Sequence, residues 1–203
     1  MIAILNAGLG NIKSVKNSLN YLSVPNEIVS DLSSFETKFT KLILPGVGSF
    51  KTAMTESKIG KFYNKIMDIK SKKFPILGIC LGSQILCTLG LEDGKTKGFG
   101  FIDGSVDKID TNLRLPHIGW NNVSIKKNHL ILNNIKNNFA AYFVHSYSMK
   151  ILNENQVYAT TSYEETFPSI VINENIIGMQ FHPEKSQKNG LLLLKNFSEF
   201  NVS

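Results

Sequence analysis

A cysteine between two glycines is the feature of this sequence with the clearest chemical potential. Cys80 stands within residues 78–82 (Gly-Ile-Cys-Leu-Gly), which follow one apolar run and precede another. This is the cysteine form of the G-x-S-x-G nucleophile elbow, whose glycines permit a tight turn that exposes the nucleophile. The start of a helix favours a thiolate and places the N–H of Leu81 against an oxyanion. We expect a nucleophile at Cys80, the alternative being an inert buried thiol.

His182 and Glu184, separated by Pro183, supply the partners that a nucleophilic cysteine needs. Such a nucleophile requires a base, and the base requires a group that orients it. Residues two apart on an extended chain point to the same side, and a proline keeps the preceding residue extended. The pattern predicts an imidazole and a carboxylate side by side at the end of residues 176–181. The alternative is a surface turn in which both are incidental.

A glycine-rich segment, residues 45–49 (Pro-Gly-Val-Gly-Ser), offers a second oxyanion donor. Two glycines within three residues let the backbone approach a ligand closely. The N–H of Val47 or Gly48 is expected in that role, unless the segment is an ordinary turn. Residues 8–10 (Gly-Leu-Gly) resemble part of a dinucleotide fingerprint, but Lys13 follows where a third glycine belongs, so no nucleotide is expected there.

The composition argues against a nucleic-acid partner and a metal. The 203 residues carry 22 Lys and Arg against 16 Asp and Glu, a net charge of +6. Arg114 is the single arginine, whereas nucleic-acid binding favours arginine for bidentate contacts. The two cysteines fit neither a disulfide framework nor a zinc site. We expect no metal and no cofactor, and a core position for Cys87 within an apolar helix.

Residues 74–91 lack a charged side chain over 18 positions, the lower limit for a membrane span. Proline, glycine and polar residues within this stretch favour a buried strand followed by a buried helix. Residues 1–6 (Met-Ile-Ala-Ile-Leu-Asn) have no basic segment before the apolar ones and predict a strand, not a signal peptide. We expect a cytoplasmic protein without a membrane partner.

Strands and helices alternate in the first half of the chain, and strands dominate the second. The patterns predict strands at residues 1–5, 26–29, 41–44, 75–79, 140–144, 157–161, 169–172 and 176–181, and helices at residues 12–22, 59–70, 81–89 and 190–200. A hairpin turn is expected at residues 173–175 (Asn-Glu-Asn). The prediction is one α/β domain over residues 1–203, with a central, largely parallel sheet flanked by helices and antiparallel strands in the C-terminal half.

Five segments spanning nearly the whole chain carry a family resemblance. They are residues 44–50 (Leu-Pro-Gly-Val-Gly-Ser-Phe), 78–84 (Gly-Ile-Cys-Leu-Gly-Ser-Gln), 116–121 (Pro-His-Ile-Gly-Trp-Asn), 142–147 (Tyr-Phe-Val-His-Ser-Tyr) and 180–187 (Gln-Phe-His-Pro-Glu-Lys-Ser-Gln). In this order they resemble the class I (triad) glutamine amidotransferases. The third and fifth segments resemble the glutaminase subunit of imidazole glycerol phosphate synthase, from histidine biosynthesis, in particular. The flavodoxin-like fold of that superfamily is then expected.

The resemblance implies roles for individual residues. Cys80 attacks the side-chain amide of glutamine, His182 moves the proton, and Glu184 orients His182. The oxyanion is held by the N–H of Leu81 together with one from Val47 or Gly48. Three further positions match residues near the bound glutamine: Gln84, Ser146 and Tyr147. The alternative for these three is a local hydrogen bond to the backbone.

The family passes ammonia to a (β/α)8-barrel cyclase on another chain. That partner makes imidazole glycerol phosphate and an aminoimidazole carboxamide ribotide, so a heterodimer is implied. The residues that match the docking face or its support are His117, Trp120, Asn121 and Lys185. Plain packing is the alternative for His117 and Trp120.

Some positions depart from the family pattern and keep other functions open. Asn6 and Ala7 stand where the family commonly has Asp-Tyr, Ser83 stands where it usually has Met, and Ser49 occupies a position that is often Ala. A paralogous glutaminase subunit that feeds a synthase amidating a surface-sugar precursor is the main alternative. A stand-alone cysteine hydrolase and a non-catalytic binding module are the others.

Overall fold

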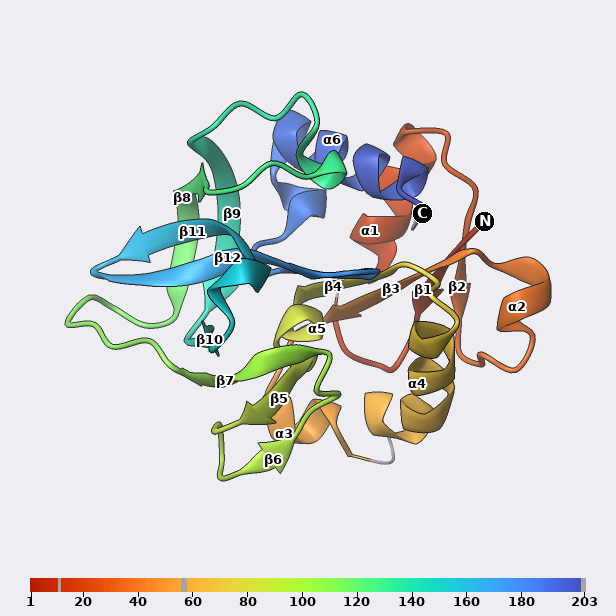
Figure 1. Ribbon diagram of the computed structural model, residues 1–203, viewed down its shortest axis with the longest axis horizontal. Coiled ribbons are helices and arrows are strands. Elements are labelled where there is room, and N and C mark those ends of the chain that lie inside the picture. Colours follow the sequence, from red (N-terminus) through yellow and green to blue (C-terminus); the bar gives the residue numbers. More distant parts are fainter. Residues whose placement is uncertain (11, 56–57, 202–203) are drawn as a thin grey trace.

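The computed structural model describes residues 1–10, 12–55 and 58–201. A nine-stranded sheet in the order β2-β1-β3-β4-β13-β12-β11-β8-β9 runs through the molecule (Figure 1). A second sheet of four strands, in the order β10-β7-β5-β6, contacts the first through β12.

Five neighbouring strands of the main sheet are parallel, as predicted. They are β2 (Asn26–Val29), β1 (Ile2–Leu5), β3 (Lys41–Gly46), β4 (Ile76–Cys80) and β13 (Ile176–Met179). Every residue of β3, β4 and β13 is buried, as expected for parallel strands with both faces covered. The carboxyl ends of such strands meet at one edge, where open α/β sheets bind their ligands.

The other half of the main sheet is antiparallel and comes from the C-terminal part of the chain. Its strands are β12 (Glu165–Asn173), β11 (Val157–Tyr163), β8 (His117–Ile125) and β9 (Phe139–His145). The ladder pairs Asn173 with Ile176, which confirms the predicted turn. Glu174 adopts a positive φ of 53° there. The predicted α/β class, with antiparallel strands in the C-terminal half, is confirmed.

The predicted helix over residues 81–89 is wrong in its second half. Helix α5 (Leu81–Gln84) stops early, and Cys87 begins a strand. The small sheet consists of β5 (Cys87–Gly90), β6 (Thr96–Lys97), β7 (Ile102–Lys108) and β10 (Tyr147–Ile151). The N–H groups of Phe99 and Phe101 bond to the carbonyls of Ile85 and Leu86, so those carbonyls are not available to continue the helix. A short apolar run does not distinguish a buried helix from a buried strand, although Cys87 is in the core as expected.

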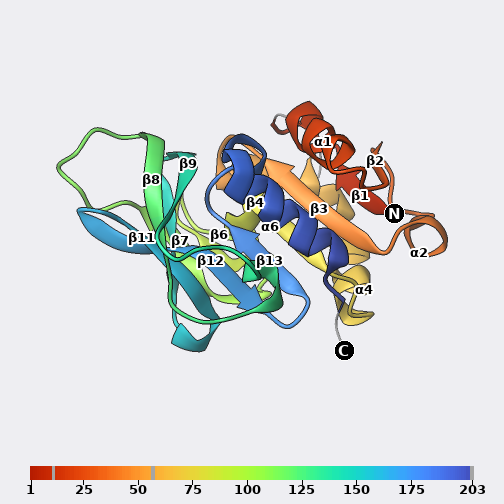
Figure 2. The same cartoon turned by 90° about the horizontal axis from the view of Figure 1, so that it is seen from above.

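Helices cover both faces of the parallel half (Figures 1 and 2). Helices α1 (Ile12–Tyr21) and α6 (Gln187–Glu199) lie on one face; α2 (Phe35–Lys38), α3 (Phe50–Ala53), α4 (Tyr63–Ser71) and the small sheet lie on the other. Short 3-10 turns occur at η1 (Ile59–Phe62), η2 (Leu130–Leu132), η3 (Glu154–Gln156) and η4 (Pro183–Lys185). Within the described residues, no helix is long and apolar enough to cross a membrane.

Alternation along each central strand supplies the two cores. Ile2 and Ile4 of β1 pack into the cluster that includes α1 and α6, whereas Ala3 and Leu5 pack into the cluster on the opposite face. This period-two pattern fixes the strand register and with it the direction in which the strand ends present their side chains.

Candidate active site

Cys80 is the last residue of β4 and directly precedes α5, so the strand-turn-helix geometry of the predicted elbow is present. Its φ of 54° is rare for a residue with a side chain. The tight turn depends on the flanking glycines. A Cβ on Gly82 would collide with the carbonyl oxygen of Leu44, and a Cβ on Gly78 would collide with backbone of Gly82.

His182 and Glu184 follow β13, the strand that pairs with β4. Nδ1 of His182 lies 2.8 Å from Oε1 of Glu184, and the two side chains are 5% and 2% exposed. The backbone N–H of His182 donates to the carbonyl of Tyr142, which anchors the residue to β9. Pro183 starts the turn η4, as a proline at a first helical position does.

Strand β13 pairs with β4 in a register that sets Met179 beside Ile79, so Cys80 and His182 follow at the same edge of the sheet and complete a Cys-His-Glu arrangement. Burial lowers the pKa of His182, but its hydrogen bonds to Cys80 and Glu184 and their charges outweigh that effect and raise the pKa to about 10. Since Glu184 engages Nδ1, Nε2 is the nitrogen left for Cys80. The thiol also lies 3.7 Å from the carbonyl oxygen of Val144. The arrangement can take a proton from the thiol and return it to a leaving group.

A cavity of about 230 Å³ opens beside Cys80. It brings together all six residues predicted to hold the oxyanion or the substrate: Val47, Gly48, Leu81, Gln84, Ser146 and Tyr147. The remaining lining residues are Cys80, Glu92, Pro116, Val144 and His145. The segment with Val47 approaches Cys80 because β3 pairs with β4 in a register that sets Gly46 opposite Cys80.

Glu92 is a cavity residue that the sequence analysis missed. Its carboxylate accepts a hydrogen bond of 2.8 Å from the N–H of Phe50. Burial raises the pKa of Glu92, an effect that this hydrogen bond opposes. The carboxylate gives the cavity an acceptor for an ammonium group. Glu92 follows strand β5, which was predicted as helix. The strand, had it been predicted, is the signal that would have placed Glu92 near Cys80.

Of the four residues predicted at a docking face, three lie on β8 and Lys185 lies on η4, and they divide between the two sides of the β8–β9 ribbon. Trp120 is 49% exposed and its ring meets that of Tyr142 edge to face. The ammonium of Lys185 lies 5.6 Å from the centre of the same Tyr142 ring. His117 and Asn121 belong to the opposite face, because side chains alternate along a strand. His117 is buried, stacked between Phe143 and Tyr163, so it lies beneath the exposed face of the ribbon.

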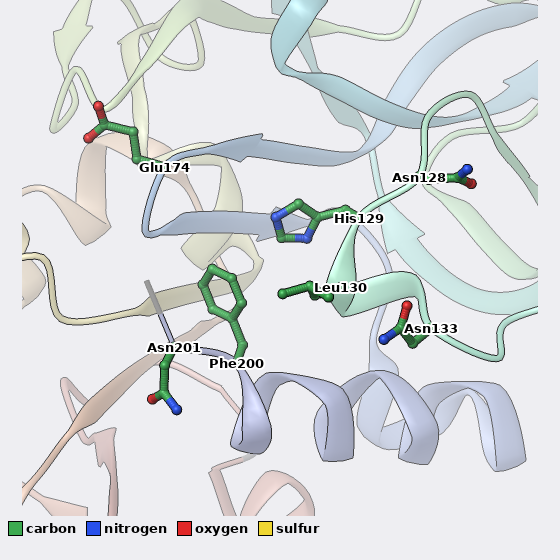
Figure 3. A pocket seen from close by; sticks show the side chains of 7 residues that line it. All are labelled: Asn128, His129, Leu130, Asn133, Glu174, Phe200 and Asn201. Carbon is green, nitrogen blue, oxygen red and sulfur yellow. The ribbon is translucent and has the colours of Figure 1, made fainter. Parts of the chain in front are cut away.

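A second, wider cavity of about 510 Å³ lies apart from the Cys80 cavity, and Figure 3 shows its lining side chains. They are Asn128, His129, Leu130, Asn133, Glu174, Phe200 and Asn201, none of which is a predicted site residue. Among residues 1–10, 12–55 and 58–201, no group of three His, Cys, Asp or Glu side chains is placed to hold a metal ion.

Comparison with known proteins identifies the family. The family model "Glutamine amidotransferase class-I" matches residues 3–199. The chain therefore belongs to the class I glutamine amidotransferases, and within them to the HisH subunits of imidazole glycerol phosphate synthase. The HisH subunit of Caldanaerobacter subterraneus subsp. tengcongensis is 41% identical over 200 residues, with 98% of each chain covered. The HisH subunit of Leptospira interrogans is 42% identical over 205 residues, covering 98% of this chain and 99% of the relative.

Solved structures agree on the fold. A crystal structure of a glutamine amidotransferase superposes with a TM-score of 0.74 at 18% identity, covering 97% of this chain and 98% of that one. The PurLQS structure from Thermotoga maritima gives the same TM-score at 16% identity, covering 97% of this chain and 96% of that one. Identities this low show a common fold and nothing more.

Proposed function

We propose that this chain, as one domain over residues 1–203, hydrolyses glutamine to glutamate and ammonia through Cys80, His182 and Glu184. The observation that carries the proposal is the strained Cys80 at the end of β4, on the same sheet edge as His182, whose Nδ1 lies 2.8 Å from Glu184. Family membership supports the choice of glutamine as the substrate.

Acylation uses the form of the pair in which Nε2 of His182 holds the proton and Sγ of Cys80 is a thiolate, the form that the raised pKa of His182 favours. Sγ attacks the side-chain amide carbon of glutamine and forms a tetrahedral intermediate. The N–H of Leu81 and one from Val47 or Gly48 stabilise its oxyanion, the kind of preorganised stabilisation that contributes most in such reactions. His182 then donates its proton to the amide nitrogen, which leaves as ammonia, and a γ-glutamyl thioester remains on Cys80.

Deacylation uses the same groups in reverse. Nε2 of His182 accepts a proton from water as the water oxygen attacks the thioester carbon, and it returns a proton to the departing sulfur. Glutamate leaves and the thiol is restored. Glu184 keeps the imidazole in the required tautomer and stabilises its charged form throughout.

The walls of the cavity hold the amino-acid end of glutamine. Glu92 offers a carboxylate for the α-ammonium group, and Gln84 offers an amide oxygen. Ser146 and Tyr147 also line the cavity and bound the space available to the substrate.

The ammonia passes to a synthase subunit, which we propose is a (β/α)8-barrel cyclase that makes imidazole glycerol phosphate and an aminoimidazole carboxamide ribotide. Relatives that share about 40% identity over their full length are named as subunits of that synthase. The exposed side chains Ile118 and Trp120, with Tyr142 and Lys185 of the adjoining turn η4, form an apolar and cationic patch beside the ribbon that leads to the cavity. Aromatic residues flanked by a cation are typical anchors of protein interfaces.

The triad is tested by glutamine turnover and by trapping the thioester. Cys80→Ala is expected to abolish both ammonia release and the 129-Da adduct, about the mass of a γ-glutamyl group, on the intact protein. The matched control is Cys87→Ala, since Cys87 is the other cysteine, is fully buried and has a pKa raised to about 12 by burial. Turnover that survives Cys80→Ala would contradict the mechanism.

A further inference from the structure

His117 and His145 form a buried pair behind the cavity that the proposed chemistry does not use. They face each other across the β8–β9 ladder, with Nδ1 of His117 3.1 Å from Nε2 of His145. The two residues are 3% and 6% exposed, and His145 also lines the Cys80 cavity.

The direction of this hydrogen bond follows from the far side of His145. Its Nδ1 lies 2.8 Å from the carbonyl oxygen of Tyr147, and a carbonyl oxygen only accepts. Nδ1 of His145 therefore carries the hydrogen, and Nε2 of the neutral ring is an acceptor. Nδ1 of His117 must donate to it, which leaves Nε2 of His117 as an acceptor in turn.

Asn121 fixes the same direction from the other end. Its Nδ2 lies 3.3 Å from Nε2 of His117 and 2.9 Å from the carbonyl oxygen of Ser162. Its Oδ1 accepts from the N–H of Asn122 at 2.8 Å. The bonds to Ser162 and Asn122 therefore identify the same atom of Asn121 as the amide nitrogen, and that atom only donates. Asn121, His117 and His145 thus donate in one continuous sequence toward Tyr147.

Burial keeps both imidazoles neutral, as this sequence of donors requires. The pKa of His145 is lowered to about 3, mainly by burial and further by nearby His117 and His182, although the bond to Tyr147 opposes this. Burial also lowers the pKa of His117. The rings of Phe143, Phe167 and Tyr163 enclose the pair.

The sequence of donors ends on the carbonyl of Tyr147, to which Gln84 also donates. The carbonyl of Tyr147 accepts a second hydrogen bond, of 2.8 Å, from Nε2 of Gln84. The other hydrogen of that Nε2 goes to Oε1 of Gln180 at 3.0 Å. With both amide hydrogens committed, Oε1 is the polar atom that Gln84 can offer to a donor in the cavity.

We propose that Asn121, His117 and His145 are positioning residues: their directional hydrogen-bond chain holds the Tyr147 carbonyl, which holds Gln84 so that its amide oxygen faces glutamine. The inference rests on the proposed glutaminase function of the Cys80 cavity. In this proposal, residues on the buried face of the β8–β9 ribbon orient the Gln84 side chain, which forms one wall of the substrate site.

Steady-state kinetics of the full-length chain test the role of the chain of hydrogen bonds. His117→Leu removes both its donor and its acceptor, and we expect KM for glutamine to rise about tenfold, with kcat changed less than about threefold. His117→Asn keeps a donor at the position of Nδ1 and is expected to restore KM to within about threefold of the native value. The control is His129→Leu, which removes a histidine beside the other cavity (Figure 3).

The tautomers give a second readout that does not depend on activity or on a stable variant. Long-range ¹H–¹⁵N correlation spectra of the native chain at neutral pH are expected to show the Nδ1–H tautomer for both His117 and His145. An Nε2–H tautomer at His145 would overturn the proposal, and so would native KM in a folded His117→Leu variant. A native chain without glutaminase activity would instead contradict the proposed function, while the tautomers would still decide the hydrogen-bond chain.

Discussion

Nδ1 of His182 lies 2.8 Å from Oε1 of Glu184, and both side chains are almost completely buried. Burial alone would lower the pKa of the imidazole, yet the hydrogen bonds to Cys80 and Glu184 raise it to about 10. A buried imidazolium without its carboxylate would be strongly destabilising. The two residues therefore have to be treated as one unit in stability as well as in catalysis.

The raised pKa of His182 predicts a stability that declines in alkali. A group whose folded pKa lies above its unfolded value contributes stability that is complete below the unfolded pKa, 6.5, and is lost as pH rises through about 10. The slope attributable to one such group is at most about 1.4 kcal/mol per pH unit. Glu184→Gln removes the carboxylate and is expected to flatten this part of the curve.

Urea unfolding of both proteins at several pH values between 6.5 and 10 measures the difference. Groups outside the site contribute equally to both curves, so the difference isolates the effect of the Glu184 charge on His182 and the Cys80 beside it. Parallel curves for the native chain and Glu184→Gln would contradict the assignment.

The parallel half of the fold and the triad are predictable because each rests on a local signal. Continuous apolar runs mark β3 and β4, and the glycines around Cys80 mark a turn that only glycine permits. Pro183 keeps His182 extended and starts the turn η4, which brings Glu184 beside it; the prediction of a fully extended segment was therefore wrong beyond His182. None of these signals depends on distant partners.

The small sheet and the buried face of β8 are not predictable in this way, because they depend on long-range pairing. The pattern of residues 81–89 fits a helix and a strand equally well. What decides between them is the long-range hydrogen bonding of Phe99 and Phe101 to the carbonyls of Ile85 and Leu86. The burial of His117 depends on the register of β8 against β9, which no local pattern near residue 117 specifies. The position of Glu92 in the cavity follows from the same small sheet.

Gly82 is expected to be the glycine least tolerant of substitution in the elbow. A Cβ there would collide with the carbonyl of Leu44, a backbone atom of a central strand that cannot move aside. Gly82→Ala is therefore expected to destabilise the fold by about 3 kcal/mol or more, at the severe end for single substitutions.

Gly94→Ala is the matched comparison, since Gly94 has a φ of +96° but open space around its Cβ position. It is expected to cost only about 1 kcal/mol, from backbone conformation alone. Thermal unfolding of the two variants measures both effects. Equal losses would show that steric contact with Leu44 is not what constrains the elbow.

The charge of Glu92 is expected to act on substrate binding. Glu92→Gln keeps the size of the side chain and an acceptor for the N–H of Phe50 while it removes the charge. We expect KM for glutamine to rise about 10- to 100-fold, which corresponds to the loss of a charge-assisted hydrogen bond, with a smaller change in kcat. Glutaminase kinetics measure this, with Asp93→Asn as the control because Asp93 is exposed and does not line the cavity. A fall in kcat at constant KM would assign Glu92 to another step.

Trp120 is expected to anchor the synthase subunit. Trp120 is 49% exposed on the ribbon that leads to the Cys80 cavity. Its ring packs edge to face against Tyr142, so it enters an interface with little loss of side-chain freedom. Trp120→Ala is expected to weaken binding of the purified synthase subunit by about 30-fold or more, as loss of an aromatic hot spot does. Titration calorimetry measures the dissociation constant. Leu152→Ala serves as the control, because Leu152 is 78% exposed and follows β10 of the small sheet, outside the β8–β9 ribbon. An unchanged dissociation constant for Trp120→Ala would place the docking surface elsewhere on the molecule.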